Sequence, residues 1–159
     1  MTISIGDRLP SATLNELRDG VQAISTDELF GGRKVLMFAV PGAFTPTCSA
    51  KHLPGYVEKL DAFRDKGVEV ACLSVNDAFV MGAWARDQNV PGDLRMLADG
   101  NGNFAKALGL ELDATPFGMG LRAKRFALYA EDGVVKQLHV EAPGEFKVSA
   151  ADYVLEQLP

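Results

Sequence analysis

The sequence predicts an α/β fold in which parallel strands joined through helices are followed by an antiparallel hairpin and a closing helix. Two almost wholly apolar runs, residues 35–40 and 68–75, are typical of central strands covered on both faces. Between them, apolar residues spaced by three and four from Leu53 to Phe63 predict a helix. The turn signal EDG at residues 131–133 predicts the hairpin. This order is that of a thioredoxin-like fold with a mixed central sheet flanked by helices.

The other elements follow in chain order. Near the N-terminus, Arg18-Asp19-Gly20 suits a hairpin turn, and Thr26 is a candidate cap for a short turn through Phe30. Pro54-Gly55 is expected to kink or loosen the helix that ends near Gly67. The remaining predictions are a helix over 78–88, a strand over 96–98, a helix over 103–108, strands over 125–130 and 134–140, and a last helix opened by Ser149.

Length and composition limit the classes of protein. A chain of 159 residues without repeats or linkers is expected to form one domain over residues 1–159. A net charge of −5 argues against nucleic acid as the main partner. No apolar stretch approaches the roughly 20 residues that span a bilayer, and the first residues lack a signal-peptide layout. These observations predict a cytoplasmic protein with no membrane partner.

The two cysteines, Cys48 and Cys72, are too few for a disulfide scaffold, and both are expected to be thiols at rest. The only histidines are His52 and His139, and the chain contains no CxxC or HxxxH pair. We therefore expect no metal site.

Cys48 lies where a strand gives way to a helix. Thr45 suits the N-cap and Pro46 the first helical position, so Cys48 falls in the first turn. There the unpaired amide groups and the helix dipole favour a thiolate over a thiol, whose pKa is ordinarily roughly 8.5. A small buried hydrophobe is the alternative reading of a lone cysteine.

The stretch PGAFTPTCSAKHLPGY resembles the active-site signature of peroxiredoxins, Pro-x-x-x-Thr-x-x-Cys, filled here by Pro41, Thr45 and Cys48. The chain is similar to the subfamily of peroxiredoxin five and the plant type II enzymes, and the likeness continues through LSVNDAFV at 73–80 and RAKRFAL at 122–128. The resemblance implies antioxidant reduction of hydrogen peroxide and alkyl hydroperoxides without metal, haem or flavin. It also implies a homodimer.

The resemblance assigns a role to each matched residue. Cys48 attacks the peroxide and becomes a sulfenic acid. Arg125 supplies positive charge and donors to the thiolate and the peroxide oxygens. Thr45 caps the helix and holds the peroxide, and Pro41 shields the sulfur.

Two neighbouring residues carry alternative readings. Arg122, Lys124 and Arg125 form a basic cluster. Alternation along a strand places Arg125 on the face opposite Lys124 and Phe126, so Lys124 and Arg125 cannot both point at the site. His52, four residues after Cys48, could form a Cys-His pair, but the resemblance favours a structural role. Trp84 and Phe79 are read as core or interface residues.

The means of recycling is left open by the sequence. The segment 141–151 has no cysteine where some relatives carry a resolving one, and Cys72 lies inside a predicted buried strand. We expect a one-cysteine cycle in which an external thiol, glutathione with glutaredoxin or thioredoxin, resolves the sulfenic acid.

Two other functions remain possible from the sequence. A thiol-disulfide oxidoreductase would need a second cysteine where Thr45 stands. A redox sensor would react once without turnover.

Overall fold

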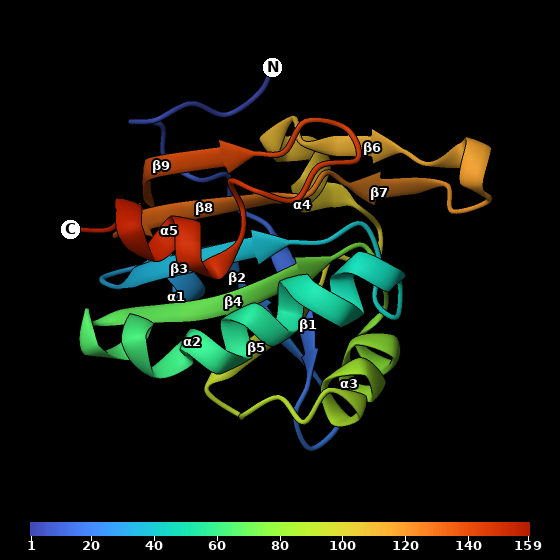
Figure 1. Cartoon of the computed structure of the whole chain (residues 1–159). Coiled ribbons are helices and arrows are strands. Elements are labelled where there is room, and N and C mark those ends of the chain that lie inside the picture. Colours follow the sequence, from blue (N-terminus) through green and yellow to red (C-terminus); the bar gives the residue numbers. More distant parts are fainter.

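A computed structural model describes all residues 1–159 and shows a seven-stranded sheet in the order β2-β1-β5-β4-β3-β8-β9 (Figure 1). β3 pairs parallel with β4 and antiparallel with β8, so the sheet is mixed as predicted. The thioredoxin-like fold class is therefore confirmed. The strands are β1 (Thr13–Leu17), β2 (Val21–Ser25), β3 (Lys34–Ala39), β4 (Val68–Ser74), β5 (Leu94–Ala98), β8 (Phe126–Glu131) and β9 (Val134–Val140).

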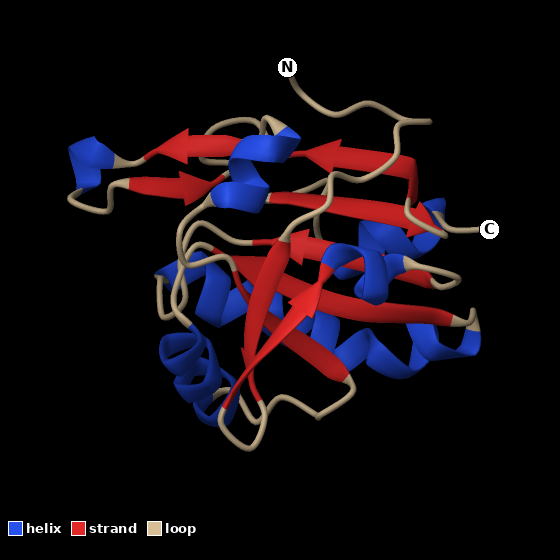
Figure 2. Ribbon diagram, turned by 180° about the vertical axis from the view of Figure 1, so that it is seen from behind, coloured by secondary structure: helices blue, strands red, loops and turns tan.

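Helices cover both faces of this sheet. The helices are α1 (Thr26–Phe30), α2 (Leu53–Asp65), α3 (Ala78–Asp87), α4 (Asn103–Leu108) and α5 (Ala151–Gln157). Buried residues of α2, α3 and α5 join one apolar cluster, and those of α1 and α4 join a second cluster on the opposite face, seen from behind in Figure 2. No helix has both the length and the apolar character needed to cross a membrane.

The apolar run of β3 divides its side chains between the two clusters. Leu36 and Phe38 enter the cluster beneath α2, while Val35 and Met37 enter the cluster beneath α1 and α4. Successive side chains of a strand point to opposite faces, so a strand with both faces covered must be apolar throughout. The prediction of a central strand at this position is confirmed.

Two predicted helix starts are wrong by one or two residues. The cap of α1 is Ser25, whose hydroxyl accepts a hydrogen bond from Glu28 N at 3.1 Å, while the Thr26 hydroxyl donates to the Pro10 carbonyl. α5 begins after Ala150 without a side-chain cap. Ser149 is buried instead, and its hydroxyl donates to Glu141.

A second hairpin, which the sequence did not predict, joins β6 (Glu111–Asp113) and β7 (Leu121–Ala123) through a 3₁₀ turn at Thr115–Phe117. It projects beyond the edge of the main sheet in Figure 1. Three residues are too short a run for the period of two to be recognised in a sequence.

The register of β3 and β8 determines where the candidate site lies. Ala39 at the end of β3 pairs with Phe126 at the start of β8. The loop after the C-terminal end of β3 and the residue before the N-terminal end of β8 therefore lie next to each other. Pro41 and Arg125, far apart in the sequence, are brought together by this pairing.

The N-cap of α3 offers a test of the local interactions that hold this layer. Asp77 accepts a hydrogen bond from Val80 N at 2.8 Å, satisfying one of the free amide groups of the first turn. We expect Asp77→Ala to lower the free energy of unfolding by about 1 kcal/mol in urea denaturation.

Asp87→Ala is the matched control, because it removes the same charge at the other end of α3, where the dipole disfavours an anion. Its free energy of unfolding should not fall. An equal loss in both variants would contradict the capping argument.

Candidate active site

The loop that leads from β3 to the cysteine is fastened to the end of β4. Val40 N donates to the Leu73 carbonyl at 3.0 Å, and Ala43 N donates to Asn76 Oδ1 at 3.0 Å. Asn76 Oδ1 also accepts from the Ser74 hydroxyl at 2.6 Å. The neighbouring strand therefore fixes the path of the loop before the helix begins.

Cys48 lies in a wide helical turn. Helical residues start at Pro46, and Cys48–His52 (η1) form a π-helical turn that continues into α2, with Leu53 N bonded to the Cys48 carbonyl. Pro54 has no N–H, and its ring crowds the carbonyl four residues earlier, which an ordinary turn cannot accommodate. The predicted loosening thus takes the form of a π turn just before Pro54, a feature frequent at functional sites.

The Arg125 guanidinium contacts both Cys48 and His52. Nη2 donates to Cys48 Sγ at 3.1 Å, and Nη1 lies 2.7 Å from His52 Nδ1. Cys48 and His52 have no exposed surface. A fixed positive charge therefore lies directly against a sulfur that water does not reach.

The other basic residues of this segment point elsewhere. Lys124 is exposed, while Arg122 donates to the backbone carbonyls of Met119 and Val75. Phe126 is buried in the cluster on the far face of the sheet. The structure thus brings only Arg125 of this cluster to the cysteine, on the face that the alternation predicted.

His52 is held in its neutral form. Burial, followed by the charge of Arg125, lowers its pKa to about 3. An arginine can only donate, so Nδ1 accepts from Arg125, and Nε2 carries the proton that is directed at the Ser149 carbonyl at 3.2 Å. His52 contacts Arg125 rather than acting as a base on the sulfur, and no sequence pattern indicated this contact.

Thr45 and Pro41 both lie in the loop, with different contacts. The Thr45 hydroxyl donates to the Gly42 carbonyl at 2.7 Å, and its own carbonyl accepts from Ser49 N at 2.9 Å. No hydrogen bond from the helix to the Thr45 side chain is present, so the expected side-chain cap is replaced by a bond within the loop. Pro41 follows β3 after one intervening residue, Val40, and is partly exposed.

A cavity of about 370 Å³ opens beside these residues. Its lining includes the polar or charged side chains of Thr47 and Arg125. Its apolar lining includes Pro41, Leu112, Phe117 and Phe146. Cys48 does not line the cavity, whereas Arg125, which contacts the sulfur, does.

The second cysteine lies in the interior of the sheet. Cys72 on β4 has no exposed surface and pairs with Phe38 on β3 and Met96 on β5. Burial raises the pKa of its thiol well above the usual range, and the nearby Cys48 adds to the effect. Both cysteines are free thiols.

Trp84 and Phe79, both expected in the core or an interface, differ in burial. Trp84 is buried, and its indole N–H donates to the Ser49 hydroxyl at 3.0 Å, one residue after Cys48. Phe79 on the same helix is 65% exposed.

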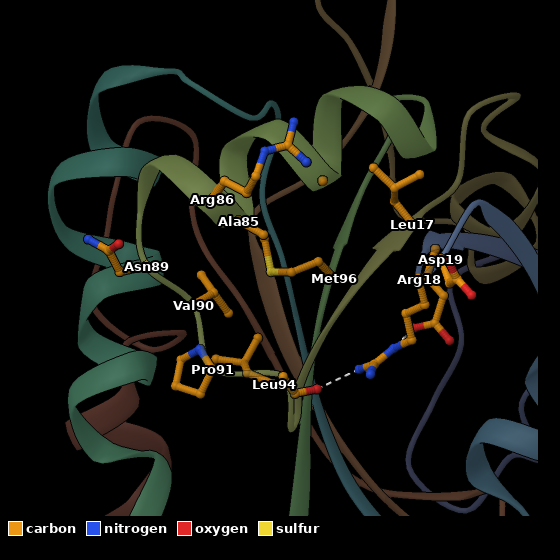
Figure 3. A pocket seen from close by; sticks show the side chains of 13 residues that line it. Leu17, Arg18, Asp19, Ala85, Arg86, Asn89, Val90, Pro91, Leu94 and Met96 are labelled. Atoms are coloured by element: carbon orange, nitrogen blue, oxygen red, sulfur yellow. Dashed lines mark hydrogen bonds and ion pairs between the residues drawn. The ribbon is translucent and has the colours of Figure 1, made fainter.

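A larger cavity of about 550 Å³ lies between the β1–β2 hairpin and the end of α3 (Figure 3). Leu17, Val90 and Met96 form part of its wall, and the Arg18 guanidinium at its edge is bonded to the Gly92 carbonyl. None of the residues around Cys48 lines it. No group of three or more histidine, cysteine or acidic side chains is placed to hold a metal ion.

A thioredoxin-like sheet that presents one buried cysteine at a helix start, against a partly buried guanidinium, defines a thiol-based oxidoreductase. The Redoxin family model matches residues 4–155. "Peroxiredoxin-2E, chloroplastic" from Arabidopsis thaliana is 48% identical over 99% of this chain and 70% of its own length. The chain belongs to the peroxiredoxins and is a thiol peroxidase with antioxidant function.

Two further comparisons agree with this assignment. "Peroxiredoxin-2E-2, chloroplastic" from Oryza sativa subsp. japonica is 49% identical over 99% of this chain and 73% of its own length. The structure of reduced Prx3 in complex with hydrogen peroxide from Vibrio vulnificus has a TM-score of 0.94 at 51% identity, covering 98% of this chain and 99% of the other.

The names of the plant relatives overturn the expected location. Both relatives are chloroplastic, so the inference of a cytoplasmic protein is wrong. Composition and the first few residues do not distinguish one aqueous compartment from another, because proteins of several compartments share the same composition.

The neutral state of His52 predicts how stability depends on pH. Its pKa lies at about 3 in the folded protein and near 6.5 when unfolded, so the unfolded chain binds a proton first as the pH falls. This contribution is complete above pH 6.5 and is lost towards pH 3. We expect the free energy of unfolding to fall by about 2 kcal/mol between pH 7 and 5 from this residue, measured by urea denaturation.

His139, whose pKa is lowered by burial, titrates in the same direction and needs a control. His52→Gln should remove most of the dependence, while His139→Gln should remove only a smaller part. A slope unchanged in His52→Gln would show that His52 is not held neutral.

Proposed function

We propose that Cys48 is the peroxidatic residue of this peroxidase. Its thiolate attacks the terminal oxygen of a hydroperoxide, an S–O bond forms, and the O–O bond breaks. The leaving oxygen takes a proton and departs as water or an alcohol, and Cys48 becomes a sulfenic acid. The single observation that carries this proposal is the 3.1 Å contact between Arg125 Nη2 and Cys48 Sγ.

Arg125, Thr45 and Pro41 assist this step. The guanidinium stabilises negative charge first on the sulfur and then on the oxygens of the breaking bond. The Thr45 hydroxyl, now bonded to Gly42, turns to the peroxide when one is bound. Pro41, which lines the cavity beside Arg125, is proposed to shield the sulfur.

Hydrogen peroxide and alkyl hydroperoxides are the proposed substrates. The apolar side chains of Leu112, Phe117 and Phe146 offer a surface for an alkyl group, and the polar end of the molecule meets Arg125. A cavity of about 370 Å³ has room for more than hydrogen peroxide.

The recycling half of the proposal is a one-cysteine cycle. An external thiol condenses with the sulfenic acid, releasing water and forming a mixed disulfide, which a second thiol reduces. Burial keeps Cys72 protonated and inaccessible, so it is a poor nucleophile for the sulfenic acid. Glutathione with glutaredoxin, or thioredoxin, is the proposed donor.

The active unit is proposed to be a homodimer of chains that each form one domain over residues 1–159. Exposed aromatic side chains support a self-association surface. Phe44 and Phe79 are 52% and 65% exposed, and Phe117 is 80% exposed.

Replacing each cysteine separates the roles of Cys48 and Cys72. We expect Cys48→Ser to abolish peroxide consumption, because the nucleophile is lost, and Cys72→Ser to retain it within about threefold with a small-thiol reductant. The measurement is peroxide consumption under turnover. Activity retained by Cys48→Ser would exclude the mechanism, and activity lost in a folded Cys72→Ser would exclude the one-cysteine cycle.

Mass spectrometry after one equivalent of peroxide tests the intermediate and the assembly together. Denatured samples should show one added oxygen per chain, converted by glutathione to a mixed disulfide, and native samples should show a dimer. Loss of two hydrogens within one chain would instead indicate a Cys48–Cys72 disulfide.

A further inference from the structure

The segment between β9 and α5 is fastened by one carboxylate outside the peroxiredoxin signature. Glu141 Oε2 accepts hydrogen bonds from Lys147 N at 2.7 Å, Ser149 N at 2.8 Å and the Ser149 hydroxyl at 2.6 Å. Burial alone would raise the pKa of Glu141, but the bonds from Ser149 and Lys147 outweigh it and lower the pKa. Glu141 is therefore a charged side chain, 8% exposed, that closes a loop of the backbone.

The backbone held in this way reaches the active-site helix. The Ser149 carbonyl accepts from Tyr56 Oη at 2.6 Å and from His52 Nε2 at 3.2 Å. A carbonyl can only accept, so its position keeps the imidazole proton on Nε2. The lone pair of Nδ1 is then available to Arg125 Nη1.

The same segment contacts Arg125 by two other routes. Glu141 N donates to the Arg125 carbonyl at 3.0 Å. The centroid of the Phe146 ring lies 4.9 Å from the centroid of the His52 ring. The same Phe146 centroid lies 5.9 Å from Arg125 Cζ. Residues 141–149 thus contact the backbone of Arg125, its guanidinium, and His52, the imidazole to which the guanidinium is bonded.

We propose that Glu141 is a positioning residue of the peroxidase: through Ser149 it fixes the tautomer of His52, and so keeps Arg125 Nη2 directed at Cys48 Sγ. This inference rests on the proposed roles of Cys48 and Arg125. Glu141 makes no hydrogen bond to Cys48, although it lines the cavity beside Arg125, and its effect passes through a chain of hydrogen bonds that begins at Glu141 and ends at Cys48 Sγ.

If Glu141 were purely structural, replacing it would lower stability without altering the chemistry of Arg125. A double-mutant cycle separates this structural role from the positioning role. Glu141→Gln keeps the size of the side chain but directs an amide group at backbone donors. We expect it to lower the rate constant of Cys48 with hydrogen peroxide by about 10- to 100-fold, because small misplacements of a catalytic donor cost that much. The single tryptophan, Trp84, bonded to Ser49, is the fluorescence reporter in stopped flow.

Three comparisons make the result specific. In an Arg125→Lys background, Glu141→Gln should lower the rate constant with hydrogen peroxide by less than about twofold, because the guanidinium donor that Glu141 positions is already absent. Alkylation of Cys48 by iodoacetamide, which needs no donor on an oxygen, should fall less than the peroxide rate. Asp152→Asn, which removes an exposed charge on α5, should leave both rates unchanged.

Additive losses in the cycle, or a peroxide rate unaffected by Glu141→Gln, would overturn the positioning role and leave the peroxidase proposal intact. Arg125→Lys reacting at the wild-type rate would instead contradict the proposed function itself. If Glu141→Gln fails to fold, ¹⁵N NMR of the wild-type protein decides: His52 must carry its proton on Nε2, and a proton on Nδ1 overturns the inference.

Discussion

The hydrogen bonds of the Arg125 guanidinium to Cys48 and His52 are the interaction on which the rest of the site depends. Arginine stays charged and can only donate, so each neighbour must present a lone pair. For His52 this requires the neutral ring with an open Nδ1, and from Cys48 it requires a lone pair of the sulfur. Neither side chain has exposed surface, so water does not compete for these bonds.

The sheet, rather than any local motif, brings these groups together. Arg125 and Cys48 are 77 residues apart in the sequence, and they meet because Ala39 pairs with Phe126 in the antiparallel register of β3 and β8. A shift of that register by one residue would turn Arg125 to the opposite face. The buried, wholly apolar β3 protects the register, since its two faces pack into separate clusters.

The parts of the molecule that follow from periodicity could be predicted, and those that follow from backbone groups could not. β3, β4 and α2 repeat apolar residues at recognisable spacing, and the position of Cys48 after Thr45-Pro46 follows from helix-start chemistry. The role of His52 depends on the Ser149 carbonyl, 97 residues away, and a carbonyl leaves no mark in a sequence. Ser149 resembled a helix cap from its position before the last helix. Its hydroxyl instead donates to Glu141, which follows the end of β9 and could not be recognised as a partner from the sequence.

The same burial that favours the first half of the reaction opposes the second. Under the proposed mechanism a hydroperoxide enters the cavity that Arg125 lines, whereas the larger glutathione or protein thiol cannot reach a sulfur with no exposed surface. In the proposed mechanism, oxidation also adds an oxygen to Cys48, which is fully buried and already in contact with Arg125. The π turn of Cys48–His52 has no side-chain cap, and Pro54 beside it contributes no N–H, so this turn lacks bonds that hold an ordinary capped helix start. In the proposed cycle, reduction of the sulfenic acid therefore requires this turn to open and the contact between Arg125 and Cys48 to break, and closing the turn again restores that contact.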